Sequence, residues 1–267
     1  MKQGPFSLPC AALLAALAFA TGAQAQQPSQ GAPLPHINPP PPAAQGAELS
    51  FDEASRIVQD TFTIWLYEGV KDEADYAKPE NIIRAALFGA YDARAGFNYV
   101  QAMKKVKGEA SAPLSTPLFS VGGRSVAAQQ VVLQEDKPAL FKGLPSVKME
   151  WGEASYNVHL DRQTVELAAL RFTGRTVAKH TAPKDVYLNE AGYFTLIDGL
   201  GDAGREPQLA RVEPRGKGYV LSGTLKNEMD DGQPDESFRL SIVPGDAPGT
   251  WRREALSLTP LQSKAKK

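Results

Sequence analysis

The chain has 267 residues, and its 29 Lys and Arg side chains nearly balance 30 Asp and Glu, which gives a formal net charge of −1. This balance excludes the basic stripe that is typical of nucleic-acid-binding proteins, so we expect no nucleic-acid partner. Cys10 is the only cysteine. A chain of this size can bury a large core without disulfides.

The first 25 residues have the three parts of a secretory signal peptide. Lys2 provides a positive start, residues 11–20 (AALLAALAFA) are apolar, and Ala23 and Ala25 are the small residues before a cleavage site. The apolar run is shorter than the roughly 20 residues that span a bilayer, and no later segment is apolar enough to do so. We therefore expect cleavage near Ala25 and an exported product, periplasmic or secreted, with neither a cysteine nor a transmembrane segment.

Composition divides the rest of the chain into three parts. Residues 26–49 are rich in Pro, Gln and Ala, which predicts a disordered linker, and His36 stands alone in it. Residues 50–259 are expected to form a single α+β domain. Residues 260–267 end in KAKK and are expected to be a disordered basic tail.

Two helices are predicted at the start of this domain. The sequence SFDE at residues 50–53 is a capping box, and apolar residues at helical spacing follow it as far as Gly69, so we expect a helix over 51–68. Pro79 suits the first turn of a second helix. That helix ends near Gly96 or continues, bent, to Gly108. Its internal glycines each weaken it by about 1 kcal/mol relative to alanine.

From about Pro117 the apolar pattern alternates, which predicts strands joined by Gly, Pro, Asn and Asp. Gly122-Gly123 indicates a tight hairpin turn. Residues 162–172 (RQTVELAALRF) are compatible with a strand or a helix, and their β-branched and aromatic residues favour a strand. We expect about ten strands in a bent, mostly antiparallel sheet, with the two N-terminal helices packed on it. The sheet is expected to be cone-like, with a sandwich or a barrel as the alternative.

The order of these elements resembles the cone-shaped fold of the nuclear-transport-factor and cystatin-like groups. The resemblance covers the two helices and the last 50 or so residues, including long strands at 218–226 and 236–243 and a last strand that carries Trp251. It implies helices covering one face of a strongly bent sheet. It rests on no diagnostic motif, and the strands of 117–190 are more than that fold needs.

Gly199, Gly201 and Gly204 have the G-x-G-x-x-G spacing of a dinucleotide-binding loop. Such a loop needs a helix after it, so that the helix amides and dipole face the phosphates. Pro207 and Pro214 interrupt the segment that follows, and an alternating pattern comes next. We therefore expect a connection between two strands and no nucleotide cofactor. Asp198 and Asp202 in this connection are candidates for a weak cation site.

Three further patterns were weighed for chemistry. Residues 227–238 resemble a calcium loop, but Phe238 stands where a bidentate glutamate is required, so we expect an acidic hairpin tip. Ser125 follows two glycines, but alanine replaces the second glycine of a nucleophile elbow. His159 and Asp161 lie on one face of a predicted strand and could form an acid/base pair. His180 lies near a turn, and no spacing in the sequence brings it to His159, so a zinc site formed by the two would depend on the tertiary fold alone.

The sequence therefore predicts an exported binding or envelope-accessory protein rather than an enzyme. Its cavity or exposed sheet would hold a small hydrophobic ligand or dock a partner protein of the envelope. Two alternatives stay open: a small-substrate enzyme built around His159 and Asp161, and a protein-interaction or inhibitor module.

Overall fold

The structure, a computed structural model, describes residues 48–65, 73–149, 152–197, 205–227 and 235–261. Within these ranges the chain has five α-helices and twelve strands, so the α+β class is confirmed. The helices are α1 (Phe51–Asp60), α2 (Glu73–Tyr76), α3 (Pro79–Val106), α4 (Pro138–Phe141) and α5 (Arg162–Thr173). A π-helical turn, Thr61–Trp65, follows α1 directly, and a 3-10 turn spans Ala128–Gln130.

The starts of α1 and α3 lie where the sequence signals place them. The Ser50 side chain accepts a hydrogen bond of 3.2 Å from the backbone N–H of Glu53, as a capping residue does. Pro79 begins α3, which needs no N–H there. This helix continues past Gly96 to Val106, so the longer of the two expected lengths is the observed one.

The strand prediction for residues 162–172 is wrong, because these residues form α5. Asp161 caps the helix by accepting a hydrogen bond of 2.7 Å from Thr164 N–H. Gly174 ends it in the left-handed conformation, with φ of 70°. Val165, Ala168, Ala169 and Phe172 are buried at spacings of three and four residues, which is a helical pattern. Tertiary burial of this face outweighs the strand propensity of its β-branched and aromatic residues.

The twelve described strands form four separate antiparallel sheets, in place of the single bent sheet of about ten strands expected. Two are short hairpins: β1 (Pro117–Val121) with β2 (Arg124–Ala127), which turns at Gly122-Gly123 as predicted, and β4 (Val147–Met149) with β5 (Gly152–Ala154). A four-stranded sheet has the order β3-β6-β8-β7, with strands Val132–Leu133, Val158–Leu160, Tyr193–Thr195 and Val186–Leu188.

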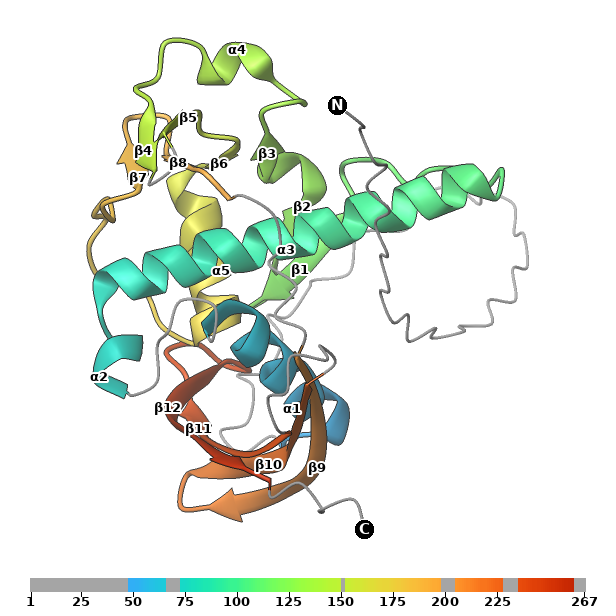
Figure 1. Cartoon of the computed structure of the whole chain (residues 1–267), viewed down its shortest axis with the longest axis vertical. Helices are drawn as coiled ribbons and strands as arrows, with labels where there is room; N and C mark the ends of the chain where they lie inside the picture. The colour runs from blue at the N-terminus through green and yellow to red at the C-terminus, as the bar shows by residue number, and fades with distance from the viewer. Residues whose placement is uncertain (1–47, 66–72, 150–151, 198–204, 228–234, 262–267) are drawn as a thin grey trace, which may run out of the picture. The chain divides into compact units, whose positions relative to one another are not determined.

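The other four-stranded sheet is a meander of the long C-terminal strands (Figure 1). Its strands are β9 (Arg205–Arg215), β10 (Gly218–Asn227), β11 (Glu236–Pro244) and β12 (Trp251–Pro260). β10 and β11 pair with Leu221 opposite Leu240, which confirms the expected pairing of 218–226 with 236–243. Trp251 opens the last strand, as expected.

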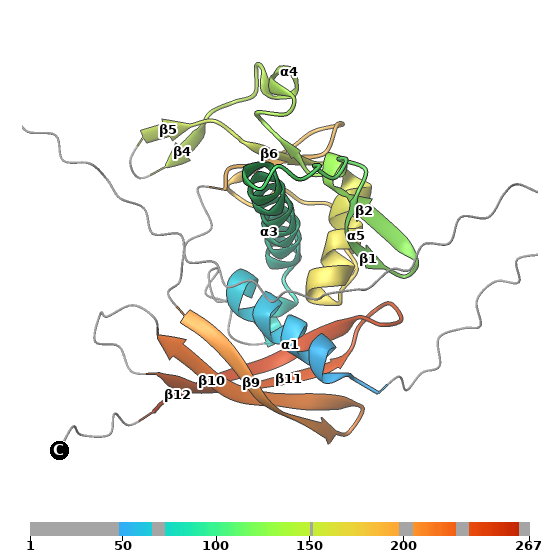
Figure 2. The ribbon, with the colours of Figure 1, turned by 90° about the vertical axis from the view of Figure 1, so that its right-hand side faces the viewer.

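Two main apolar cores hold these elements together. In the first, α3 and α5 pack on each other and on β1, β2, β6 and β8. In the second, α1 and the π-helical turn pack on the inner face of the β9–β12 sheet. Figure 2 shows α1, α3 and α5 between that sheet and the strands β3 to β8. The ends of α1 and α5 therefore meet the start of β12 where the two cores adjoin, and the candidate site lies there.

In the described part of the chain, no helix combines the length and the apolar character that crossing a membrane requires.

Candidate functional site

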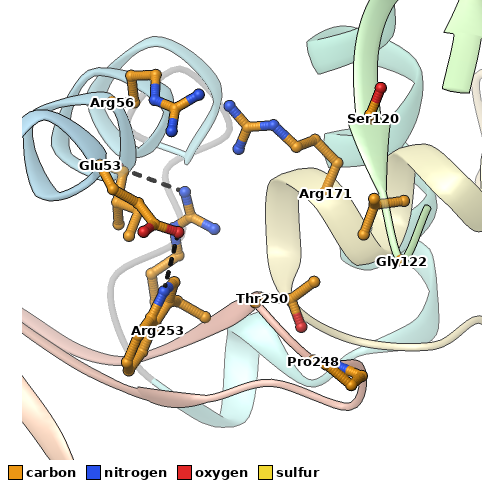
Figure 3. A pocket seen from close by; sticks show the side chains of 12 residues that line it. Glu53, Arg56, Ser120, Gly122, Arg171, Pro248, Thr250 and Arg253 are labelled. Atoms are coloured by element: carbon orange, nitrogen blue, oxygen red, sulfur yellow. Dashed lines mark hydrogen bonds between the residues drawn. The ribbon is translucent and has the colours of Figure 1, made fainter. Parts of the chain in front are cut away.

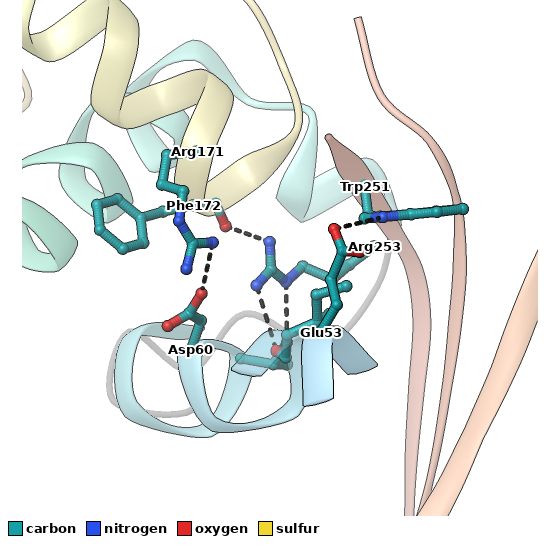
Figure 4. A network of polar contacts seen from close by, with 8 residues as sticks. Glu53, Asp60, Arg171, Phe172, Trp251 and Arg253 are labelled. Carbon is teal, nitrogen blue, oxygen red and sulfur yellow. Dashed lines mark hydrogen bonds and ion pairs between the residues drawn. The ribbon is translucent and has the colours of Figure 1, made fainter. Parts of the chain in front are cut away.

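Arg253 on β12 joins the two cores. Its side chain is buried, with 2% of its surface exposed, and its Nε donates a hydrogen bond of 2.8 Å to Thr61 Oγ1. Its Nη1 donates to the carbonyl of Phe172, and its Nη2 lies 3.4 Å from the carbonyl of Ile57 (Figure 4). Carbonyls in the last turns of helices carry partial negative charge, so both helix ends favour a cation here. Burial lowers the pKa of Arg253 to about 10, which leaves it charged at neutral pH.

A second arginine links α5 to α1. The Nη1 of Arg171 donates to Asp60 Oδ2 at 2.9 Å, and its guanidinium carbon lies 5.2 Å from the centre of the Phe172 ring. Only one nitrogen of Arg171 is used by this ion pair, so its other N–H groups remain available toward the space in front of α5.

The loop between β11 and β12 is fixed against the end of α5. Asp246 N–H donates to the carbonyl of Gly174 at 2.8 Å, and Asp246 Oδ2 accepts from both the N–H and the hydroxyl of Thr176. A Cβ on Gly174 would lie 2.4 Å from the backbone of Trp251, so only glycine allows this approach. The loop is thereby held in place as one wall of a cleft.

The opposite wall contains a paired carboxylate. Glu53, in the first turn of α1, accepts a hydrogen bond of 3.3 Å from the indole Nε1 of Trp251 on β12. The indole ring packs edge-on against Tyr219, with the ring centres 5.4 Å apart. The sequence predicted that Glu53 would reach back to the backbone of its own helix; the structure gives its carboxylate a partner on the last strand.

These walls enclose a cleft of about 240 Å³, which we call the arginine cleft. α1 contributes Glu53, Arg56 and Ile57, α5 contributes Arg171, and the β1–β2 hairpin contributes Ser120, Val121 and Gly122; the remainder comes from 248–251 and Arg253. In Figure 3 the side chains of Arg56 and Arg171 extend toward each other from their two helices. Arg56 is exposed, and within the described residues it has no ion-pair or hydrogen-bond partner.

The cleft favours a negatively charged ligand. Its wall has three guanidinium groups and one carboxylate, that of Glu53, which already accepts from Trp251. Guanidinium groups present planar pairs of N–H donors that match carboxylate and phosphate oxygens. The volume is below the roughly 300–1,000 Å³ of pockets for drug-sized ligands, so the matching ligand is small.

His159 and Asp161 are two residues apart in sequence, and the structure gives them separate contacts. His159 is buried, with its Nε2 3.1 Å from the carbonyl of Ala191 and its ring centre 4.5 Å from that of Phe194. Burial lowers its pKa. Asp161 caps α5 through Oδ1. His159 is thus covered whereas Asp161 is exposed, and neither residue lines the arginine cleft.

His180 pairs with residues other than His159. Its Nδ1 lies 2.7 Å from the hydroxyl of Tyr193, and its Nε2 lies 3.0 Å from Glu166 Oε1. Burial raises the pKa of Tyr193 to about 12, so the phenol stays protonated at neutral pH. Among the described residues, no group of three His, Cys, Asp or Glu side chains is arranged to hold a metal ion.

Some sequence candidates can be placed only in part. Asp198, Asp202 and the three motif glycines lie outside the described residues, as do 228–234 of the acidic tip. The segment after the glycine motif forms strand β9, not a helix. Ser125 is exposed on β2, with its Oγ 2.7 Å from Ser120 Oγ at the edge of the arginine cleft.

Sequence reasoning missed all three arginines of the cleft. They lie on α1, α5 and β12, with 115 positions between Arg56 and Arg171 and 82 between Arg171 and Arg253. The alternating pattern gave no signal, because Arg253 is in register with the exposed Ala255, Ser257 and Thr259, and a register shift beside Arg253 turns its side chain inward, where a charge needs a partner. Nothing in one sequence shows that this partner is the ends of two helices.

Comparisons with protein families, with curated proteins and with solved structures found no match for this chain.

Proposed function

We propose that this protein is exported and binds a small anionic molecule in the arginine cleft. The observation that carries the proposal is the convergence of Arg56, Arg171 and Arg253 on one cleft with a single carboxylate. The ligand class is a small molecule with one or two carboxylate or phosphate groups. This deepens the binding role predicted from the sequence, in which the ligand was left open and a hydrophobic one was considered.

Each arginine supports a different part of this role. Each of the three guanidinium nitrogens of Arg253 contacts an oxygen of Thr61 or of a helix carbonyl. Arg253 therefore contributes a positive charge that is fixed in place. Arg171 is held by Asp60 and has free N–H groups to offer. Arg56 has no partner in the described part of the chain, so it can close on a ligand without breaking an existing contact.

Export rests on the leader at residues 1–25 and is tested separately. We expect the N-terminal sequence of the protein recovered from the exported fraction to begin at Gln26. Recovery only from the cytosol, with Met1 retained, would contradict this part of the proposal.

Ligand binding is tested by isothermal titration at low salt with succinate, malonate, glycerol phosphate and inorganic phosphate. We expect at least one of them to bind, and Arg56→Gln to weaken its binding by roughly 10- to 100-fold, the value of one charge-assisted pair of hydrogen bonds. Arg239→Gln is the matched control, because Arg239 is exposed on β11 and does not line the cleft. Equal affinity of Arg56→Gln and the parent, or binding of none of the four anions, would contradict the proposal.

A further inference from the structure

The C-terminal half of α3 leaves one face without a protein partner in the described residues. The buried positions of this helix end at Arg94, twelve residues before the helix itself ends at Val106. Figure 1 shows this half extending beyond α5. Four large apolar side chains are exposed on it: Tyr99, Val100, Met103 and Val106, the last with 81% of its surface exposed.

These side chains form a continuous stripe, which we call the α3 stripe. Residues 99, 103 and 106 are spaced by four and three residues, so they lie above one another on one face of the helix, with Val100 beside them. The opposite face is used differently: Gln101 Oε1 accepts a hydrogen bond of 2.6 Å from Ala112 N–H, which holds the following loop against that side. The loop therefore leaves the α3 stripe uncovered.

The charge around the α3 stripe has one sign. Lys104, Lys105 and Lys107 lie within the last turn and at the C-cap, and the 16 residues 93–108 contain no Asp or Glu. Successive helix residues are about 100° apart, so Lys107 falls beside the stripe, whereas Lys104 and Lys105 fall on the opposite face, on either side of Gln101. An apolar helical face backed by a lysine-rich polar face is the pattern of helices that lie on the surface of an anionic membrane.

We propose that the α3 stripe docks on the surface of a membrane that contains anionic phospholipids, with its apolar side chains at the level of the headgroups and its lysines against the phosphates. The inference is independent of the arginine cleft, so either can fail without the other.

The test is co-sedimentation of the exported protein with vesicles of phosphatidylglycerol and phosphatidylethanolamine, compared with vesicles of phosphatidylcholine alone. We expect binding to the anionic vesicles that weakens as salt is added. The triple variant Lys104→Gln, Lys105→Gln, Lys107→Gln should lose about fivefold per lysine. The double variant Met103→Ser, Val106→Ser should lose roughly tenfold or more.

Phe51→Ser is the matched control, since Phe51 is another exposed apolar side chain, 54% exposed, but lies on α1. It should bind anionic vesicles as the parent does, and all variants should keep the parent's thermal midpoint because the altered side chains are exposed. Failure of the parent to bind, equal binding to phosphatidylcholine, or unchanged binding by both stripe variants would overturn the proposal. A dimer that Met103→Ser, Val106→Ser dissociates, without vesicle binding by the parent, would overturn it in favour of self-association.

Discussion

The Nε of Arg253 lies 2.8 Å from Oγ1 of Thr61, so a buried cation on the last strand is bound to the π-helical turn that follows α1. Thr61 in turn donates its hydroxyl to the carbonyl of Ile57 at 2.6 Å, the same carbonyl that Arg253 approaches. A π-helical turn changes the i→i−4 hydrogen-bond pattern of a helix. Here it sets a carbonyl and a hydroxyl side by side at the back of the arginine cleft.

Replacing Arg253 should destabilise the whole fold. Arg253→Met removes three charge-assisted contacts and leaves the carbonyls of Ile57 and Phe172 buried with one partner fewer, so we expect a loss of about 3 kcal/mol in the free energy of unfolding. Urea denaturation measures it. Arg239→Met, on the exposed face of β11, should stay within about 0.5 kcal/mol of the parent. A loss of similar size in both variants would show that the contacts of Arg253 with Thr61, Ile57 and Phe172 do not stabilise the fold as described.

The two glycines within α3 should respond to alanine in opposite directions. A Cβ on Gly89 would lie 2.6 Å from the Phe172 ring and 2.9 Å from Ile64, whereas a Cβ on Gly96 would meet nothing within 4 Å. Gly89→Ala should therefore destabilise by about 1–3 kcal/mol through overpacking, less the gain in helix propensity. Gly96→Ala should stabilise by about 0.5–1 kcal/mol. Thermal unfolding followed by circular dichroism checks both, and equal shifts would contradict the packing of α3 on α5.

Asp92 should make stability fall as the pH rises. Burial, followed by the nearby charge of Asp60, raises the pKa of Asp92 from 3.8 to about 6. A raised carboxyl pKa means that the folded state holds the proton more tightly, so the stabilisation is complete below pH 4 and is lost as the pH rises through 6. The free energy of unfolding of Asp92→Asn, relative to the parent, should therefore increase by up to about 3 kcal/mol between pH 4 and 7.

Chemical denaturation at four or five pH values measures this difference. Glu135→Gln, which changes an exposed carboxylate, is the control, and the change with pH should be larger for Asp92→Asn than for this variant. A difference for Asp92→Asn that does not vary with pH would contradict the raised pKa of Asp92.

Glu166, His180 and Tyr193 should act as one unit. The His180 ring bridges the other two side chains, with its Nδ1 2.7 Å from the Tyr193 hydroxyl and its Nε2 3.0 Å from Glu166 Oε1. Tyr193→Phe and Glu166→Ala should each cost about 1 kcal/mol, and a double-mutant cycle should give a coupling of at least about 0.5 kcal/mol. Strictly additive effects would mean that the histidine does not transmit the interaction.

Local signals in the sequence predicted the elements whose ends they mark. The Ser50 cap, Pro79, the Gly122-Gly123 turn and the pairing of β10 with β11 depend on neighbouring residues or on a short connection, and the structure contains each of them. The same kind of signal was present for α5, since Asp161 caps it and Gly174 ends it. Because Asp161 is assigned to a strand as an acid/base candidate in the interpretation of the sequence, it is not used there as a helix cap.

Long-range packing could not be predicted from one sequence. The strands form four sheets, and α3 and α5 pack on each other between them. This packing requires glycine at position 89, because a Cβ there would lie 2.6 Å from the Phe172 ring. In the sequence, Gly89 and Gly96 look alike. The arginine cleft likewise depends on contacts between residues 192 and 81 positions apart.

The indole N–H of Trp251 reports most directly on the arginine cleft, because it donates to Glu53 in the cleft wall. In a ¹H–¹⁵N spectrum, with the signal assigned by its loss in Trp251→Phe, titration with the anion that binds best should shift this signal to saturation. In Arg56→Gln the same titration should need at least ~10-fold more anion, the loss expected for one charge-assisted pair. A Trp251 signal that stays in place in the parent, or that shifts at the same concentrations in both proteins, would contradict a small-anion site in this cleft.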